Sequence, residues 1–208
     1  VGEMSLTSKK VTKAIEPIRG EDVETQIDVS IYEAFFGMEK KISLRTINGK
    51  MKTFTVKIPA GIDDGQTVVL RGEGEPGEQG GPKGDLYINV HVKKHSIYTR
   101  SGDNVLCDIP ITFTQATLGA DLKIPMVDGK QEIYRIPDGT QSGTRFTIRN
   151  KGFKSINGNS YGDFVFTVQV QVPKRLTKEQ RDILTELAKT MNPPLTTVLQ
   201  NAFDMGDM

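Results

Sequence analysis

The sequence predicts a mostly β fold of two tandem, β-sandwich-like domains with the same topology, followed by a short C-terminal helix. An internal repeat divides most of the chain into two similar halves, and each half shows the two-residue alternation of β-strands. A single stripe of apolar residues with helical spacing follows the second half. The chain has 208 residues, enough for two small domains of about 100 residues each.

The repeat consists of short motifs that recur in the same order. Ile58-Pro59-Ala60-Gly61 returns as Ile136-Pro137-Asp138-Gly139, and Gly84-Asp85-Leu86 returns as Gly162-Asp163-Phe164. An ordered match of this kind indicates two copies of one domain. The predicted organisation is a linker at 1–19, a first domain at 20–100, a second domain at 101–173, and a helix with a tail at 174–208.

Each copy is predicted to begin with a strand that runs into one or two helical turns. The first strands are expected at 23–29 and 105–111. Capping boxes are predicted for the turns that follow, and a glycine ends each turn. These residues are Ser30, Glu33 and Gly37 in the first copy, and Thr112, Gln115 and Gly119 in the second.

The last strand of each copy gives the clearest strand pattern. Leu86, Ile88, Val90 and Val92 alternate with more polar residues, as expected of a half-buried strand. The second copy repeats the pattern in Phe164, Phe166, Val168, Val170 and Val172.

The C-terminal helix is predicted over residues 177–191. Thr177 and Gln180 can form a capping box, and Asn192-Pro193-Pro194 would end the helix. Its apolar residues fall on one stripe: Ile183, Leu184, Leu187, Ala188 and Met191. Residues 195–208 mix apolar and acidic side chains and are predicted to be a mobile tail.

Composition argues against several classes of function. The 27 basic and 26 acidic side chains give a net charge of +1, whereas proteins that hold nucleic acid usually carry a basic excess. The single cysteine, Cys107, allows neither an internal disulfide nor a Cys-x-x-Cys metal site. There is no apolar run of about 20 residues and no signal-peptide core. These features predict a cytoplasmic protein.

The motifs that could carry chemistry favour structural interpretations. Residues 72–77 match the spacing G-x-G-x-x-G, but more glycine and proline follow instead of a helix, so a surface loop is expected. His91 and His95 are too far apart along a strand to share a metal, and Cys107 is expected to be a small buried thiol. No nucleophile–base set stands out. The sequence therefore predicts no enzyme, no cofactor and no metal.

The first hairpin suggests a binding surface. If Asn48-Gly49 is a two-residue type I′ turn, Ile42 pairs with Thr55 and Leu44 with Thr53. The two aliphatic residues would then face away from Phe54, as an extended-peptide groove requires. In the second copy the same register sets Ile124 against Ile133. The alternative interpretation is that Ile42 and Leu44 are ordinary core residues, since a one-residue slip reverses every face.

A series of motifs over residues 19–192 resembles the C-terminal region of DnaJ-type J-proteins. The motifs are Arg19-Gly20-Glu21-Asp22, Glu33-Ala34-Phe35-Phe36-Gly37, Val56-Lys57-Ile58-Pro59-Ala60-Gly61, Gly72-Glu73-Gly74-Glu75-Pro76-Gly77, Gly84-Asp85-Leu86-Tyr87, Ala116-Thr117-Leu118-Gly119, Ile136-Pro137-Asp138-Gly139-Thr140-Gln141-Ser142-Gly143 and Leu176-Thr177-Lys178-Glu179-Gln180. The resemblance implies two β-rich client-binding domains and a C-terminal dimerisation segment.

Departures from the family pattern refine this expectation. The J-domain with its His-Pro-Asp signature and the glycine/phenylalanine linker are absent, so the chain by itself is expected not to stimulate a DnaK-type ATPase. Zinc-bearing relatives insert four Cys-x-x-Cys motifs where this chain has only the hairpin Arg45–Lys52. The chain therefore resembles the zinc-free class B proteins, including the curved-DNA-binding cousins of DnaJ.

The resemblance also implies binding residues in the first domain and a dimer interface at the C-terminus. Carried over position by position, the client groove contains Val23, Thr25, Ile27, Lys40, Ile42, Leu44 and Tyr98. The dimerisation residues are Ile183, Leu184, Leu187 and Met191.

The predicted function is that of a co-chaperone fragment. As a homodimer it would bind extended apolar segments of unfolded clients for delivery to a DnaK-type chaperone. The C-terminal tail of that chaperone is an alternative occupant of the same groove. A DNA-binding module like the curved-DNA-binding cousins is the alternative function, and the near-neutral charge argues against it.

Overall fold

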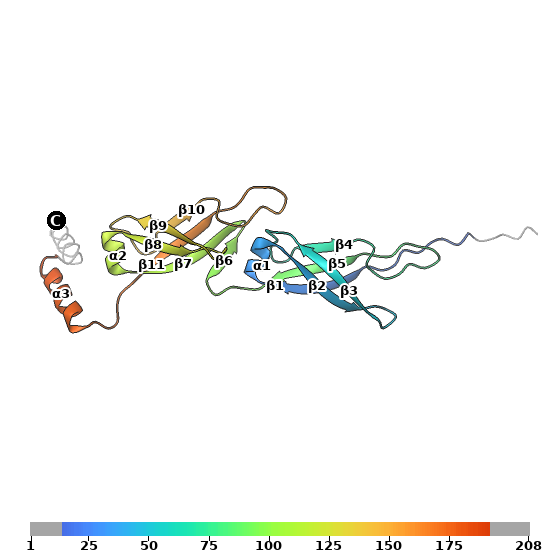
Figure 1. Ribbon diagram of the computed structural model, residues 1–208, viewed down its shortest axis with the longest axis horizontal. Coiled ribbons are helices and arrows are strands. Elements are labelled where there is room, and N and C mark those ends of the chain that lie inside the picture. Colours follow the sequence, from blue (N-terminus) through green and yellow to red (C-terminus); the bar gives the residue numbers. More distant parts are fainter. Residues whose placement is uncertain (1–13, 192–208) are drawn as a thin grey trace, which may run out of the picture.

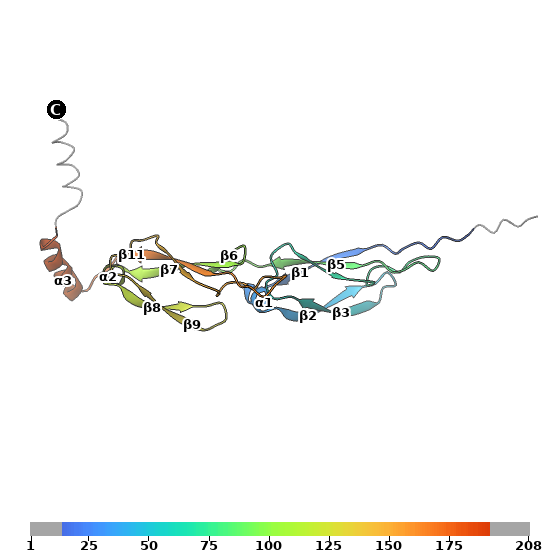
Figure 2. The same ribbon diagram turned by 90° about the horizontal axis from the view of Figure 1, so that it is seen from above.

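The computed structural model describes residues 14–191 and contains two β-rich units in a row, with a helix at the far end (Figure 1). The first unit (residues 18–92) is followed by the second unit (residues 98–171), and the C-terminal helix lies beyond the second. Seen from above, each unit has two layers of strands (Figure 2). The predicted mostly β fold is confirmed.

The first unit packs a three-stranded sheet against a hairpin. The sheet has the order β1-β5-β4, with β1 parallel and β4 antiparallel to the central β5, and the hairpin is β2-β3. The elements are β1 (Val23–Val29), α1 (Ile31–Phe36), β2 (Met38–Arg45), β3 (Met51–Ile58), β4 (Thr67–Leu70) and β5 (Leu86–Val92).

The second unit repeats this arrangement and adds one strand. Its sheet has the order β10-β11-β7-β6, and its hairpin is β8-β9. The added strand, β6, pairs antiparallel with β7. The elements are β6 (Tyr98–Ser101), β7 (Asn104–Thr112), α2 (Phe113–Leu118), β8 (Ala120–Pro125), β9 (Gln131–Ile136), β10 (Arg145–Ile148) and β11 (Phe164–Gln171).

Register shows which strands of the two units are equivalent. Val23 lies opposite Leu86 in β1 and β5, and Val105 lies opposite Phe164 in β7 and β11. Strand β7 therefore corresponds to β1, β11 to β5 and β10 to β4. In both units the inward residues of the central strand are fully buried and form the middle of the core: Leu86 and Ile88 in β5, and Phe164 and Phe166 in β11.

The predicted ends of the short helices are confirmed. Ser30 caps α1 and Thr112 caps α2, and each forms both hydrogen bonds of a capping box with Glu33 or Gln115. Gly37 and Gly119 end the helices with positive φ angles. At Gly37 a Cβ atom would also crowd the backbone of Ala60, so glycine is required there for both reasons.

The predicted hairpin register was wrong by one residue. The Thr46 amide donates to Lys50 O (2.8 Å) and the Gly49 amide to Thr46 O (2.9 Å), and Gly49 is the residue with positive φ at the tip. This is a three-residue loop, one residue longer than a type I′ turn, so the pairing shifts by one. Ile42 accordingly lies opposite Phe54.

The shift puts Ile42 and Leu44 on the same face as Phe54. The prediction that they face the opposite way was wrong, although both side chains remain half-buried. The second hairpin has the same loop and the same shift, because Gly129 has positive φ and the Met126 amide donates to Lys130 O (2.9 Å). Ile124 therefore pairs with Glu132 and not with Ile133.

A buried arginine joins the two units. Arg100 of β6 donates to the carbonyl oxygens of Gly61 (2.7 Å) and Ile62, and its guanidinium carbon lies 4.0 Å from the ring centroid of Phe153. Its side chain is 11% exposed. Gly61 in turn packs so closely on Lys154 O that no Cβ atom would fit. Because residues 61–62 and 153–154 belong to different units, these contacts fix one unit against the other.

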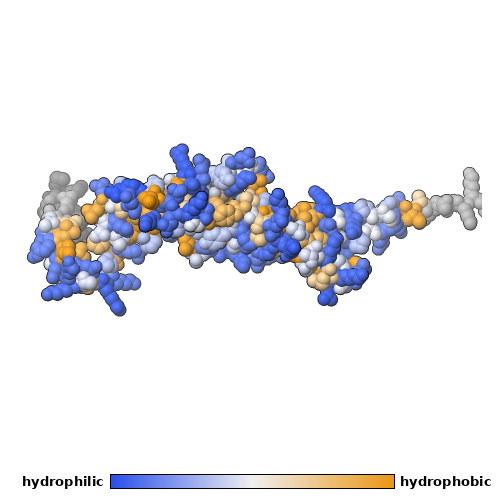
Figure 3. Space-filling view, in the orientation of Figure 1, coloured by the Kyte–Doolittle hydropathy of each residue, from blue (hydrophilic) through white to orange (hydrophobic). Residues whose placement is uncertain are grey.

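The C-terminal helix α3 (Lys178–Lys189) starts where it was predicted and ends slightly earlier. Thr177 and Gln180 form the expected capping box. No residue of α3 is buried, and most of its apolar stripe faces solvent, as the orange atoms at that end of the molecule show (Figure 3). Within residues 14–191, no helix is long and apolar enough to cross a membrane. The predicted tail at 195–208 lies outside the described residues.

Candidate binding groove of the first unit

Within residues 14–191, two strand edges without partners flank one side of the first unit. Strand β1 ends its sheet and β2 pairs only with β3. Backbone groups of successive residues in a strand point to opposite sides, and the Val23 amide donates to Asp85 O at the start of β5. The N–H and C=O groups of Glu24 and Gln26 therefore point to the open side of β1, ready to pair with another strand.

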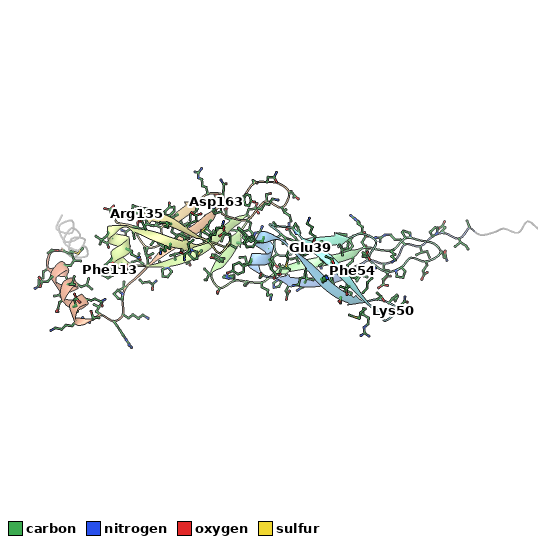
Figure 4. All side chains as sticks on the ribbon, in the orientation of Figure 1. Glu39, Lys50, Phe54, Phe113, Arg135 and Asp163 are labelled. Carbon is green, nitrogen blue, oxygen red and sulfur yellow. The ribbon has the colours of Figure 1, made fainter. Side chains whose placement is uncertain are left out.

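A cavity of about 340 Å³ lies between these edges, at the hairpin end of the unit. Val23 of β1, Leu44 of β2 and Phe54 of β3 supply its apolar walls, and Pro76 adds a wall from the loop between β4 and β5. Phe54 lies on β3 (Figure 4), and its side chain is packed into the unit, since only 9% of the residue is exposed. The cavity can thus accept one or a few apolar side chains from an extended chain.

An ion pair lies at the rim of this cavity. Lys52 Nζ is 2.7 Å from a carboxylate oxygen of Glu73 and 5.1 Å from the centroid of the Phe54 ring. Both side chains are roughly 40% exposed, with 47% for Lys52 and 35% for Glu73. The pair places one charge of each sign beside the apolar floor, and its exposure makes its own contribution to stability small.

Asp85 anchors the loop that carries Glu73 and Pro76. Its carboxylate accepts a hydrogen bond from the Gly72 amide (2.9 Å) and contacts Arg71 (3.0 Å) and Arg19 (3.2 Å). The pKa of Asp85 is lowered chiefly by the Gly72 amide and further by Arg71. Ionised at neutral pH, Asp85 holds this end of the loop beside the cavity.

Lys40 connects the two open edges at the other end of the groove. Its ammonium donates to Asp28 O, the last outward-facing carbonyl of β1, at 2.6 Å. Lys40 thereby joins β2 to β1, and its role in client binding stays a prediction. Val23 and Thr25 are half-buried, whereas Ile27 is buried in the core at 7% exposure.

Tyr98 does not join the other predicted groove residues, and its placement in the first domain was wrong. Tyr98 starts β6, which pairs with β7 of the second unit, where its hydroxyl donates to Pro125 O (2.7 Å). The side chain is 5% exposed, and burial raises its pKa to about 12. The residues before Ser101 that form β6 therefore belong to the second unit.

Sequence reasoning missed Phe54, Lys52, Glu73 and Pro76 as lining residues. Phe54 was expected in the core alone, because the assumed register put it on the face opposite Leu44. A three-residue hairpin loop would have revealed the shared face. Glu73 and Pro76 lie in a glycine-rich loop without strand periodicity, so no pattern in the sequence places them near β2.

A second apolar cavity, of about 380 Å³, lies between α2 and α3. Phe113 of α2, Pro173 and Leu176 line it together with Ile183 and Leu184 of α3. Of the predicted dimerisation residues, Leu184 is half-buried here, whereas Ile183 (61%), Leu187 (49%) and Met191 (63%) are exposed.

The groups considered for chemistry have structural environments. Cys107 is a buried thiol as predicted, and burial raises its pKa. His91 Nδ1 lies 2.9 Å from a carboxylate oxygen of Asp64, while His95 contacts the Tyr32 hydroxyl at 3.0 Å. In the described part of the chain, no three His, Cys, Asp or Glu residues are grouped as metal ligands.

Comparison with known proteins identifies the family. The model for the DnaJ C terminal domain matches residues 23–173, which span both units from β1 to the end of the second sheet. The chain belongs to the DnaJ C-terminal domain family. In this DnaJ C-terminal region, the groove lies in the first of the two repeated units, and α3 follows the matched segment.

The relatives of this DnaJ C-terminal region are named chaperones. "Chaperone protein DnaJ" of Ruminiclostridium cellulolyticum is 51% identical over 138 residues, which are 66% of this chain and 36% of the relative. That of Clostridioides difficile is 51% identical over 140 residues (67% and 36%), and that of Acetivibrio thermocellus 49% over 134 residues (64% and 34%). The chain thus matches about a third of the length of these relatives.

Proposed function

We propose that this chain is the client-binding part of a DnaJ-type co-chaperone, and that it holds extended apolar segments of unfolded proteins in the groove between β1 and β2. The cavity lined by Val23, Leu44 and Phe54 is the observation that carries this proposal. It lies between two strand edges that pair with no further strand in the described part of the chain. Backbone pairing gives affinity for any extended chain, while apolar walls favour segments that are normally buried.

One exposed surface fits a further part of this function. The apolar stripe of α3 is proposed to pair with a second copy of the chain, which would bring two grooves to one client and raise avidity without new contacts. The bound segment would then pass to a DnaK-type chaperone. The zinc-free class of the family remains a prediction from the sequence.

The Leu44→Ser variant tests the groove. Leu44 is half-buried and lines the cavity, so the change is expected to weaken binding of an apolar peptide at least about tenfold, from the lost burial of about 1.5–3 kcal/mol. Fluorescence anisotropy with a labelled peptide gives the affinity, and thermal melts of the same samples report folding.

Ile58→Ser serves as the contrasting variant. Ile58 is 1% exposed on the same hairpin, so its replacement is expected to unfold the first unit by creating a cavity around a buried hydroxyl. If Leu44→Ser melts as early as Ile58→Ser, Leu44 is a core residue. If Leu44→Ser folds normally and binds peptide as well as the unchanged chain, the groove is elsewhere.

A further inference from the structure

The cavity between α2 and α3 has apolar walls on two separate elements. Phe113 forms one wall and lies on α2, at the end of the second unit that faces α3 (Figure 4). Ile183 and Leu184 of α3 belong to the other wall. No residue of α3 is buried, and Ile183 is 61% exposed. An apolar group that enters between the walls would bury surface on both and hold α3 against the second unit.

Basic side chains surround the same cavity. Arg175 lines it, and Lys178 and Arg181 follow at the start of α3. All three are exposed, and none of them forms an ion pair within residues 14–191, where the ion pair of α3 joins Lys189 to Glu186 at its other end. Positive charge at the start of a helix is unfavourable, because the helix dipole is positive there. These charges therefore favour an acidic partner.

The sequence after α3 contains a segment of matching chemistry. Residues 192–208 include two acidic residues, Asp204 and Asp207, and no basic residue. Phe203 and Met205 stand on either side of Asp204. An extended chain turns alternate side chains to opposite sides, so such a segment can offer apolar groups to a cavity and a carboxylate to its rim.

This segment is also within reach of the cavity. Ile183 precedes Lys189, the last residue of α3, by a rise of about 9 Å along the helix. Phe203 follows Lys189 along the chain by a stretch that spans up to about 46 Å when extended. Pro193 and Pro194 disfavour continuation of the helix, which lets the chain turn back. A tethered segment also has a high effective concentration at a nearby site.

We propose that residues 202–207 dock in the cavity between α2 and α3 of the same chain. Phe203 enters between Phe113 and Ile183, and the two carboxylates pair with the basic side chains at the rim. The docked segment fixes α3 against the second unit. Leu187 and Met191 do not line the cavity, so they stay available for the proposed contact with a second copy. This inference goes beyond client binding and does not depend on it.

A nitroxide attached to Asn201→Cys reports docking in the full chain. Cys107 is 5% exposed, so a thiol reagent modifies the new cysteine instead. The nitroxide is expected to broaden the amide signals of Phe113 and Ile183. The amide signal of Ile88, in the first unit, is expected to stay unchanged.

Phe203→Ser in the labelled chain tests whether the docking is specific. The change is expected to lower the docking equilibrium constant at least about tenfold, because it removes the burial of one aromatic side chain. Val198→Ser is the matched control, since Val198 is apolar but precedes the docking segment. Equal broadening of Phe113 in the unchanged chain and in Phe203→Ser would contradict the inference.

Charge reversal tests the rim. The double variant Arg175→Glu, Arg181→Glu is expected to weaken docking about threefold or more, with the largest effect at low salt. Adding Asp204→Lys and Asp207→Lys is expected to restore docking. The control is Lys41→Glu, Lys57→Glu, which changes the net charge equally on exposed positions of the first unit. If the control weakens docking as much, or if the added changes restore nothing, the charge pairing is wrong and the proposed docking fails.

A mixed sample identifies the chain that supplies the segment. Nitroxide-labelled chains without isotope are mixed with isotope-labelled chains that lack the nitroxide, and no broadening is expected. Broadening of Phe113 in this mixture would mean that the segment docks on a second copy, which overturns the inference. Peptide binding in the groove of the first unit is measured separately with Leu44→Ser, so neither result decides the other.

Discussion

The Tyr98 side chain fills a region of the second unit, whereas the first unit has a cavity. In the second unit its ring lies 6.1 Å from that of Phe164 and stacks on His95 at 5.0 Å, and its hydroxyl binds the backbone of β8. In the first unit, Val23, Leu44 and Phe54 line a cavity instead. Two domains with one topology are thus distinguished by a residue that belongs to a neighbouring strand.

The raised pKa of Tyr98 leads to a prediction at alkaline pH. Burial raises it from 10.0 to about 12, so the folded chain holds this proton more strongly than the unfolded chain does. The resulting stability is present below pH 10 and is lost as the pH rises through about 12. Denaturant unfolding across this range is expected to show a smaller loss of stability for Tyr98→Phe than for the unchanged chain. Equal losses would contradict a buried phenol.

The same variant is informative at neutral pH. Tyr98→Phe removes the hydroxyl that donates a hydrogen bond to Pro125 O. The free energy of unfolding is therefore expected to fall by about 0.5–1.5 kcal/mol. Tyr161→Phe is the control, because Tyr161 is 49% exposed and no hydrogen bond of its hydroxyl is seen within residues 14–191. A comparable loss in both variants would show that the Tyr98 hydrogen bond contributes nothing specific.

At the level of elements, local signals in the sequence predicted the fold well. Capping boxes and terminal glycines located α1, α2 and the start of α3, because these signals depend only on residues within one turn. Strand β1 has the predicted bounds, since alternation of side chains is also local. The pairing between strands was harder, and the hairpin register shows why.

Asn48-Gly49 is compatible with both a two-residue and a three-residue loop, because either one accepts glycine at positive φ. The choice between them depends on packing of the whole hairpin, where Phe54 and Val56 must both reach the core. A one-residue error then reversed the predicted face of Ile42 and Leu44. Their inclusion in the groove came through resemblance as well, and Leu44 indeed lines the cavity between the open edges.

The exposed stripe of α3 gives a prediction about assembly. Ile183 and Leu187 are 61% and 49% exposed on one face of the helix, which favours burial against another chain. The double variant Ile183→Ser, Leu187→Ser is expected to be a folded monomer by light scattering at concentrations where the unchanged chain is expected to be a dimer. Thr185→Ser, on another face of α3, is the control. A double variant that stays dimeric would place the interface elsewhere.

At the level of the whole molecule, Gly61 offers a direct test of the junction between the units. Gly61 and Gly65 both have positive φ angles (90° and 82°), but a Cβ atom would meet Lys154 O only at Gly61 and has open space at Gly65. Gly65→Ala is expected to lower the unfolding free energy by only about 1–2 kcal/mol, the cost of holding alanine at a positive φ angle. Gly61→Ala is expected to lose more unfolding free energy. It is also expected to widen the range of angles between the two units, which small-angle scattering would show. Identical behaviour of the two variants would mean that the junction is not rigid.

The junction held by Arg100 has a consequence for the proposed client binding by a proposed dimer. The groove of the first unit and the exposed stripe of α3 lie at opposite ends of an elongated molecule (Figure 1). If two copies join through α3 and the junction does not bend, the two grooves of the pair lie at a fixed distance from each other. A polypeptide that occupies both grooves must then have two apolar stretches separated by enough residues to reach from one groove to the other. Compactly folded proteins, whose apolar stretches are buried close together, could not reach both grooves. Binding at both grooves would therefore depend on how far a chain has unfolded.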